Sequence, residues 1–294
     1  MELTKDQKRN YVSVIGILSA IDRREGTTAN GDPYVAGTFT VKAGDQEYKV
    51  EAFEMKTWGR GTNTERPNPK YSGLLELTNG ESVDFSCSLV ENRFFSQGQI
   101  YSSTRVSLAF INKPRAGAEP GLKFDIAGFV TQPIQEVRDK EDNLTHYSIK
   151  IGQAQYDLSR GVSAVELTVD PKNQSAVQYM RDNYTLHKTV RVSGHGVAKI
   201  VTEVIKEEAV FGDPIERVYQ NYTAHFVIDS GSVVPAEDVY REDQIEALVR
   251  ATRDRDEEMK SSASKPASSA ASSGASSFAD SSGGADTVGS LFGL

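Results

Sequence analysis

The sequence predicts an all-β protein made of two consecutive five-stranded barrels, followed by one helix and a disordered tail. Three observations lead to this prediction. Short segments of alternating apolar and polar residues are separated by turn residues, the order of these segments occurs twice, and Ser, Ala and Gly dominate the C-terminal end. The 294 residues suit two domains and an appendage. We expect the first barrel in residues 1–115, the second in 116–234, the helix in 235–260 and the tail in 261–294.

The first barrel is expected to contain a long apolar strand, a hairpin and two further long strands. These predicted strands cover residues 11–21, 34–43, 46–55, 81–92 and 100–113. Gly44-Asp45 separates the second strand from the third and is a typical hairpin turn. Because successive side chains of a strand point to opposite faces, alternation in this hairpin predicts five inward residues. They are Phe39, Val41, Tyr48, Val50 and Ala52.

The same order restarts after a linker rich in Pro and Gly at residues 113–123. The new first strand repeats the early glycine of the first barrel, with Gly128 in the place of Gly16. Further strands are expected in residues 144–153, 163–170, 188–204 and 217–229, with a short helix over 173–184. The outward positions of the second and third strands carry few aromatic residues: His146, Ser148, Lys150, Glu166 and Thr168.

Five strands with a connection between the third and the fourth fit the oligonucleotide/oligosaccharide-binding (OB) barrel. The competing interpretation is a pair of β-sandwiches, which would need about seven strands each. We therefore expect tandem five-stranded OB-fold barrels.

The C-terminal part divides into a charged helix and a polar tail. The helix has a narrow apolar stripe that comprises Ile245, Leu248, Val249 and Thr252. We therefore expect the helix to dock weakly on a neighbouring domain and its charged side chains to be solvated. Of the 34 residues from Ser261 onward, 24 are Ser, Ala or Gly, a composition that cannot form a core. The tail regains large apolar residues at its end, which we interpret as a docking motif for a protein partner rather than a random terminus: Leu291, Phe292 and Leu294.

Several classes of protein are disfavoured. No apolar run is long enough to span a membrane, and the charged N-terminus does not resemble a secretory signal. The single cysteine, Cys87, cannot form an internal disulfide or a zinc cluster, so we expect a cytoplasmic protein. Nucleotide-binding glycine motifs and a nucleophile elbow are absent, and the four His residues are scattered. We expect no catalysis, no cofactor and no metal.

Two segments of the first barrel combine cations with aromatic residues. Residues 56–71 are expected to form a long mobile loop, and they contain Lys56, Trp58, Arg60, Arg66, Lys70 and Tyr71. The hairpin between the fourth and fifth strands contains Arg93, Phe94, Phe95, Tyr101 and Arg105. Phe94 and Phe95 are adjacent, so at least one of them must be exposed or cap the barrel. The alternative for the loop is that Trp58 folds over the barrel end and the cations are merely solvated.

The outward face of strands two and three adds a third group: Tyr34, Thr38, Lys42, Lys49 and Phe53. In OB barrels this face and the loops after strands one and four bind oligonucleotides. Single strands are held by cations along the phosphates and by aromatic rings on which bases stack. The three segments therefore predict one groove for a single strand on the first barrel.

The charge distribution also favours the first barrel as the main binding unit. The whole chain has a net charge of −8. Residues 1–115 hold 15 Lys and Arg against 14 Asp and Glu, a net of +1, whereas residues 116–232 hold 12 against 16, a net of −4. The acidity lies in the C-terminal two-thirds, and we expect the second barrel to contribute little to binding.

With its repeated barrel, aromatic and basic loops and Ser/Gly/Ala tail with an apolar tip, the chain resembles bacteriophage and bacterial single-stranded DNA-binding proteins. The resemblance implies sequence-tolerant coating and protection of single strands in DNA replication, recombination or repair, and recruitment of replication proteins through the tail tip. The tail departs from that family because it holds only Asp280, Asp286 and the terminal carboxylate as acids. Two other interpretations stay open: a non-catalytic adaptor within a replication complex, and a barrel appendage of a multi-subunit enzyme.

Overall fold

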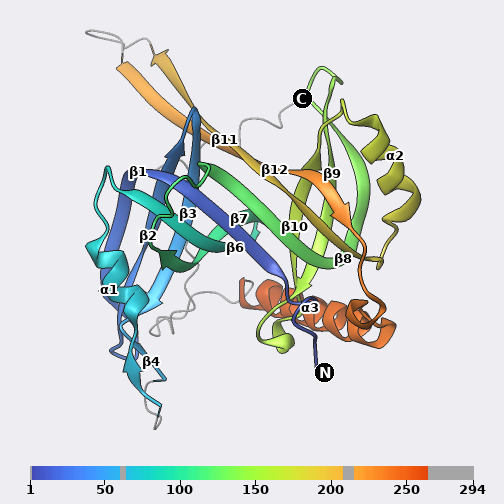
Figure 1. Cartoon of the computed structure of the whole chain (residues 1–294), viewed down its shortest axis with the longest axis horizontal. Helices are drawn as coiled ribbons and strands as arrows, with labels where there is room; N and C mark the ends of the chain where they lie inside the picture. Colours follow the sequence, from blue (N-terminus) through green and yellow to red (C-terminus); the bar gives the residue numbers. More distant parts are fainter. Residues whose placement is uncertain (1, 60–63, 208–214, 264–294) are drawn as a thin grey trace.

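The computed structural model describes residues 2–59, 64–207 and 215–263, shown as coloured ribbon in Figure 1. Arg60 and the predicted tail tip lie outside these ranges. Among the helices that the structure describes, none has the length and hydropathy of a transmembrane span.

The N-terminal strands close into a first barrel. Its strands are β1 (Asn10–Thr27), β2 (Pro33–Ala43), β3 (Gln46–Met55), β6 (Ser82–Ser96) and β7 (Gln99–Asn112). They neighbour one another in the order β1-β2-β3-β7-β6, and β6 also pairs with β1. All pairings are antiparallel except that of β3 with β7, where Val50 lies beside Val106. The connection from β3 to β6 contains β4 (Thr57–Trp58), β5 (Arg66–Pro67) and α1 (Pro69–Glu76).

A second barrel repeats this arrangement. Its strands are β8 (Gly121–Arg138), β9 (Leu144–Ala154), β10 (Val162–Val169), β11 (Thr189–Glu207) and β12 (Ile215–Ser232). They follow the order β8-β9-β10-β12-β11, with β11 pairing back to β8 and β10 parallel to β12. The one-turn helix η1 (Leu158–Arg160) precedes β10, and α2 (Gln174–Asn183) lies between the third and fourth strands. This order is the five-stranded Greek-key barrel of the OB fold, so the predicted tandem OB fold is confirmed.

Each barrel depends on a long first strand that bends to reach both of its neighbours. A side chain at Gly16 or Gly128 would collide with a carbonyl oxygen of the adjacent strand, so both positions require glycine. The register shifts directly after Leu18 in β1 and after Val130 in β8, in each case two residues beyond the glycine. Such bulges increase local bending, which allows one strand to close the barrel.

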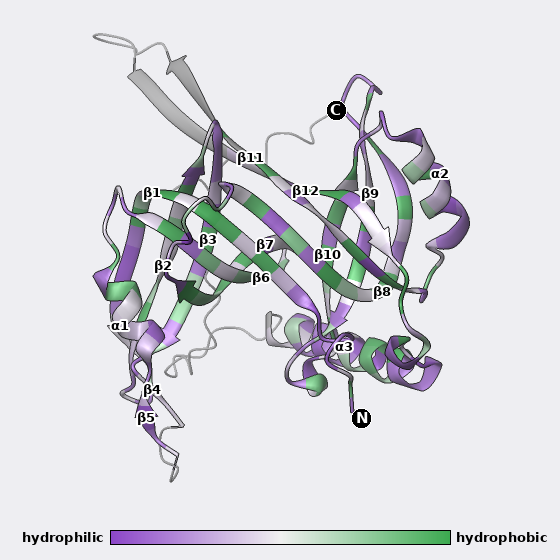
Figure 2. Ribbon diagram, in the orientation of Figure 1, coloured by the Kyte–Doolittle hydropathy of each residue, from purple (hydrophilic) through white to green (hydrophobic). Residues whose placement is uncertain are grey.

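The core is formed by alternating residues of the long strands, visible as alternating hydrophobic and hydrophilic bands in Figure 2. The five inward residues predicted for the β2–β3 hairpin are all buried in it. Gly44 adopts a positive φ of 65° in the turn of that hairpin, as its sequence predicts. Cys87 is also buried, and burial raises the pKa of its thiol, so this cysteine is a core residue rather than a nucleophile.

The two barrels share one sheet and one continuous core. β1 pairs with β8 from Asn10 beside Ile126 to Ile15 beside Gly121. The side-chain amide of Asn10 donates hydrogen bonds to the Leu89 carbonyl oxygen (2.6 Å) and to Gln153 Oε1 (2.7 Å). In addition, β11 crosses the first barrel, where the Tyr48 hydroxyl donates to the Gly196 carbonyl oxygen (3.0 Å). The predicted division of the chain at residues 115 and 234 stays a prediction.

The C-terminal helix α3 (Glu242–Ala263) follows the short helix η2 (Ala236–Asp238) and lies below the second barrel in Figure 1. Ile245 and Leu248 are buried in a small cluster with Leu3 and Phe129, but Val249 of the predicted stripe is exposed. The expectation that the helix charges are solvated is wrong for Asp256, whose carboxylate pairs with Arg93 of β6. The helix therefore ties the two barrels together.

Candidate nucleic-acid interface

Two pairs of stacked aromatic rings lie on the outer surface of the first barrel. Tyr34 of β2 and Phe53 of β3 have ring centroids 5.1 Å apart and ring planes 27° apart. Phe94 of β6 and Tyr101 of β7 face each other across their hairpin, with centroids 5.7 Å and planes 21° apart. The exposed fractions of Phe94 and Tyr101 are 37% and 41%. Exposed rings of this kind offer π faces to unpaired bases.

Strand alternation explains why the hairpin presents Phe94. Phe95, the next residue, lies opposite Ile100 and is half-buried. The expectation that at least one of the two Phe residues must be exposed therefore agrees with their placement.

The structure corrects the expected long mobile loop at residues 56–71. Its described part contains the β4–β5 ribbon, in which Trp58 lies opposite Arg66, and the first turn of α1. Asn68 caps that helix by accepting a hydrogen bond from the Lys70 backbone N–H (3.0 Å), and proline follows directly at the first helical position. Tyr71 lies on the helix and packs against the hydrophobic core, so its ring serves the fold.

Trp58 is half-buried beneath two cations. The Arg66 guanidinium carbon lies 5.1 Å and the Lys70 ammonium 5.9 Å from the centroid of its ring. Lys70 also lies 5.4 Å from the ring centroid of Phe110 and forms an ion pair with Glu54 (2.6 Å). We call Trp58, Arg66, Lys70 and Phe110 the tryptophan cluster. It combines the cations and rings that a single strand requires, although Lys70 has a carboxylate partner in the free protein.

Sequence reasoning missed Phe110, which is 58% exposed at the end of β7. Val106 and Leu108 are buried, so simple alternation would place Phe110 inward as well. The register of β6 and β7 shifts between Ser86 and Cys87, and Ala109 is the extra residue on β7. This bulge turns Phe110 to the outer side.

Two of the predicted phosphate-binding arginines already have carboxylate partners. The Arg105 guanidinium donates to both oxygens of Glu51 at 2.9 Å. Arg93 pairs with Glu91 (3.0 Å) and with Asp256 of α3. Because these carboxylates balance the arginine charges, Arg93 and Arg105 position the hairpin in the free protein, and a phosphate would have to compete for them.

The predicted lysines differ in their surroundings. Lys42 and Lys56 are exposed on the first barrel. The Lys49 ammonium lies 4.8 Å from the ring centroid of Tyr222, which belongs to β12 of the second barrel. Lys49 is therefore at the junction of the two barrels rather than on an open face.

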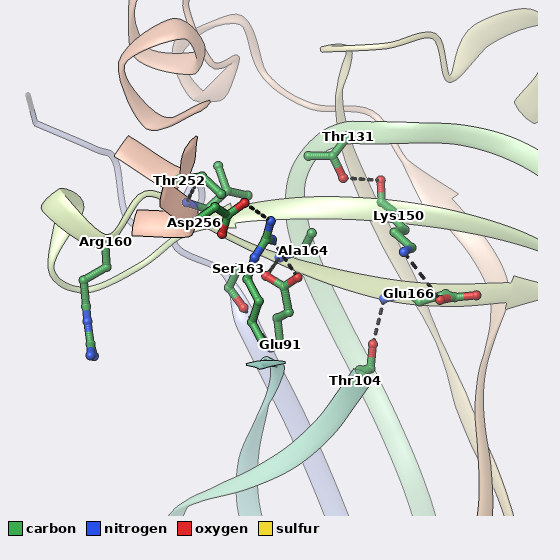
Figure 3. A network of polar contacts seen from close by, with 12 residues as sticks. Glu91, Thr104, Thr131, Lys150, Arg160, Ser163, Ala164, Glu166, Thr252 and Asp256 are labelled. Atoms are coloured by element: carbon green, nitrogen blue, oxygen red, sulfur yellow. Dashed lines mark hydrogen bonds and ion pairs between the residues drawn. The ribbon is translucent and has the colours of Figure 1, made fainter. Parts of the chain in front are cut away.

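The β6–β7 hairpin contacts the edge of β10 in the second barrel, and Figure 3 shows the hydrogen bonds. The Ala164 backbone N–H donates to the Glu91 carboxylate (3.1 Å), and the Glu166 N–H donates to Thr104 Oγ1 (2.8 Å). Ser148 and Thr168, which alternation places on the outer face, are buried. The second barrel thus uses the edge of β10 to hold the first.

The described residues contain no group of three or more His, Cys, Asp or Glu side chains placed to hold a metal ion. His146 and His225 contact each other edge to face, with centroids 5.1 Å apart, while His195 pairs with Asp229 at 2.9 Å.

Comparison with known proteins adds a family and several structural likenesses. The model of a family described as YorF matches residues 8–264. No curated protein sequence matches the chain.

Among solved structures, a deletion mutant of the single-stranded DNA binding protein from Thermus aquaticus is 13% identical, with 79% of this chain and 97% of that chain covered and a TM-score of 0.45. The wild-type form of that protein gives 13% identity, 77% and 95% coverage and a TM-score of 0.43. A Replication Protein A heterotrimer bound to ssDNA gives 12% identity, 86% and 54% coverage and a TM-score of 0.21. These are loose likenesses, and the OB fold of this chain follows from its own strand order and pairing.

Proposed function

This chain belongs to the YorF family, and we propose that it binds single-stranded DNA with little sequence preference. One observation carries the proposal: stacked aromatic pairs lie on the β2–β3 face and on the β6–β7 hairpin, the two places that OB barrels use to bind oligonucleotides. These pairs are Tyr34–Phe53 and Phe94–Tyr101, and the tryptophan cluster on the β3–β6 connection and the end of β7 adds cations and further rings.

The chemistry of these groups favours single strands over duplexes. Unpaired bases expose their flat faces, and stacking on an aromatic side chain contributes about 1–3 kcal/mol per base. Every base has such a face, so binding by stacking tolerates any sequence. In a duplex the faces are covered by neighbouring base pairs, which leaves only phosphate contacts to the exposed cations.

Phosphate contacts are assigned to the cations predicted from the sequence. Lys42 and Lys56 are exposed and can reach phosphates directly, whereas Lys70, Arg93 and Arg105 must exchange a carboxylate for a phosphate. Arg60 belongs to the same proposed set and lies outside the described residues. Salt dependence of binding measures how many of these contacts form.

In the cell, we place this activity in DNA replication, recombination or repair, where a sequence-tolerant binder coats and protects exposed strands. The tail tip with Leu291, Phe292 and Leu294 is proposed to recruit protein partners. A pull-down with full-length protein and with Phe292→Ala tests the tip. Loss of partners with the variant supports recruitment, and identical partner sets count against it.

The DNA-binding proposal is tested by fluorescence anisotropy of a labelled oligothymidine with the full chain, beside a duplex of the same length. We expect saturable binding of the single strand, weaker binding of the duplex, and a fall in affinity as salt rises. Equal affinity for both, or no binding at low salt, would refute the proposal. A protein that binds neither DNA would instead fit the non-catalytic adaptor.

A further inference from the structure

A cavity of about 640 Å³ lies between the two barrels. It is bounded by β3 and β7 of the first barrel and by β8, β9, β10 and β12 of the second. The side chains that bear on its chemistry are Lys49, Arg105, His146, Thr168, Tyr222 and His225. Its volume lies within the range of small-molecule sites, roughly 300–1,000 Å³.

One wall of this cavity is the outer face of β10. Leu167 and Val169 of β10 are fully buried in the core, so Thr168 between them lies on the opposite face of the strand, where it lines the cavity. Thr168 is only 6% exposed, and its Oγ1 has no hydrogen-bond partner among the described residues. This oxygen is buried behind the cavity wall, so the wall presents no hydroxyl to a ligand, and recognition depends on the rings and the lysine around it.

Flat rings form one side of the cavity. Tyr222 of β12 accepts a hydrogen bond at its hydroxyl from the Lys49 backbone N–H (3.2 Å), which fixes the ring against β3. The rings of His146 and His225 meet edge to face beside it. Burial, and then the neighbouring His225, lowers the pKa of His146 below its ordinary value, so this imidazole is neutral at neutral pH. Neutral rings can stack on a base or exchange hydrogen bonds with its edge.

One cation at the cavity is available to bind the phosphate group of a nucleotide. Glu51 is paired with Arg105 (2.9 Å), and Glu166 lies 3.9 Å from the ammonium of Lys150. The Lys49 side chain forms no ion pair with any described residue and is held only by the Tyr222 ring. Lys49 is therefore the cation at this junction that can take a phosphate without first giving up a carboxylate.

We propose that this cavity binds one nucleotide of the bound single strand, with its base among the rings of Tyr222, His146 and His225 and its phosphate at Lys49. This inference rests on the proposed function. It gives the second barrel a part in DNA binding, at the junction of the barrels rather than on its own outer face.

The first test compares two substitutions that each remove one lysine charge. Lys49→Gln removes the cation at the cavity, and Lys140→Gln removes an exposed one outside it. Lys49→Gln should reduce the slope of log affinity against log salt by about 0.7, as loss of one single-strand phosphate contact does, whereas Lys140→Gln should leave the slope unchanged.

The second test uses the four histidines of the chain as reporters in NMR. His146 and His225 line the cavity, whereas His187 and His195 do not and serve as internal controls. Oligothymidine should shift the ring signals of the first two and leave those of the second two in place. Inorganic phosphate at the same concentration should not reproduce the shifts.

The outcomes separate this inference from the proposed function. If wild-type protein does not bind oligothymidine in the anisotropy assay, the proposed function fails and the nucleotide site fails with it. If wild-type protein binds but Lys49→Gln keeps the wild-type salt slope and the His146 and His225 signals stay unmoved, the nucleotide site alone is refuted. Shifts reproduced by inorganic phosphate would also overturn it, because they would indicate an anion site without base recognition.

Discussion

Replacing Phe94 by Ala separates a binding role from a structural one. Phe94 is 37% exposed, and its stacked contact is with Tyr101 across the hairpin. Cross-strand pairs of this kind contribute about 0.2–1 kcal/mol to folding, so the unfolding temperature should fall by no more than about 2–4 °C. Loss of one stacked base should cost about 1–3 kcal/mol of binding, which is roughly a 5- to 150-fold weaker Kd.

The assay is oligothymidine binding by anisotropy, read beside thermal unfolding of the same samples. Tyr156→Ala is the matched control, because Tyr156 is a fully exposed aromatic residue of the second barrel. It should change neither quantity. Phe85→Ala removes a fully buried ring and should cost about 3–5 kcal/mol of stability. The reasoning is refuted if Phe94→Ala binds as tightly as wild type, or if it destabilises the fold as Phe85→Ala does.

Three further results are expected. Lys56→Gln should reduce the slope of log affinity against log salt by about 0.7, because one phosphate contact with the single strand is lost. Lys140 is exposed on the second barrel, and Lys140→Gln should leave this slope unchanged. Although burial raises the pKa of Asp125, hydrogen bonds and charge from Arg191 and Arg9 bring it below its ordinary value. The ionised carboxylate of Asp125 therefore stabilises the fold fully at pH values above the ordinary carboxyl pKa, and this contribution is lost as pH falls through the lowered pKa. Asp125→Asn should have a smaller free energy of unfolding than wild type at pH 7. In acid the two free energies, measured by chemical unfolding, should become similar. Deleting residues 264–294 should leave the thermal unfolding temperature and oligothymidine affinity unchanged, because these residues include only one Lys and two Asp and compete weakly for a cationic surface.

Strand alternation was sufficient to predict the barrels and their core. Phe39 and Val41 are two residues apart on one strand, and both are buried as period-two patterning requires. The same rule fails at Phe110, because Ala109 is an extra residue whose place depends on the pairing of β6 with β7. A bulge of this kind is set by the partner strand, so a single segment of sequence does not reveal it.

Residues 56–71 also contain a helix-start signal. Asn68 followed by Pro69 is a typical cap and first helical residue, and it predicts the helix that the structure shows from Pro69 to Glu76. This signal places Tyr71 on a helix rather than in a loop. The Gly, Asn and Pro of residues 56–71 favour a loop over the whole segment, although its second half carries the helix signal.

Contacts between distant parts of the chain lay beyond sequence reasoning. Arg93 and Asp256 are 163 positions apart, and their ion pair depends on how α3 docks against the first barrel. The contacts at the edge of β10 depend likewise on the position of the β6–β7 hairpin. The sequence identifies Arg93 as a candidate cation for phosphate binding, but its pairing with Asp256 follows only from the packing of the helix α3 against the two barrels.

Trp58 is the only tryptophan of the chain, so its fluorescence reports directly on the tryptophan cluster. The measurement is a titration of the full-length protein with oligothymidine at low salt, with a duplex of the same length as control. We expect saturable quenching by the single strand, reversed by added salt, and little change with the duplex. An emission that stays constant while anisotropy reports binding would place the DNA elsewhere and contradict the proposed interface.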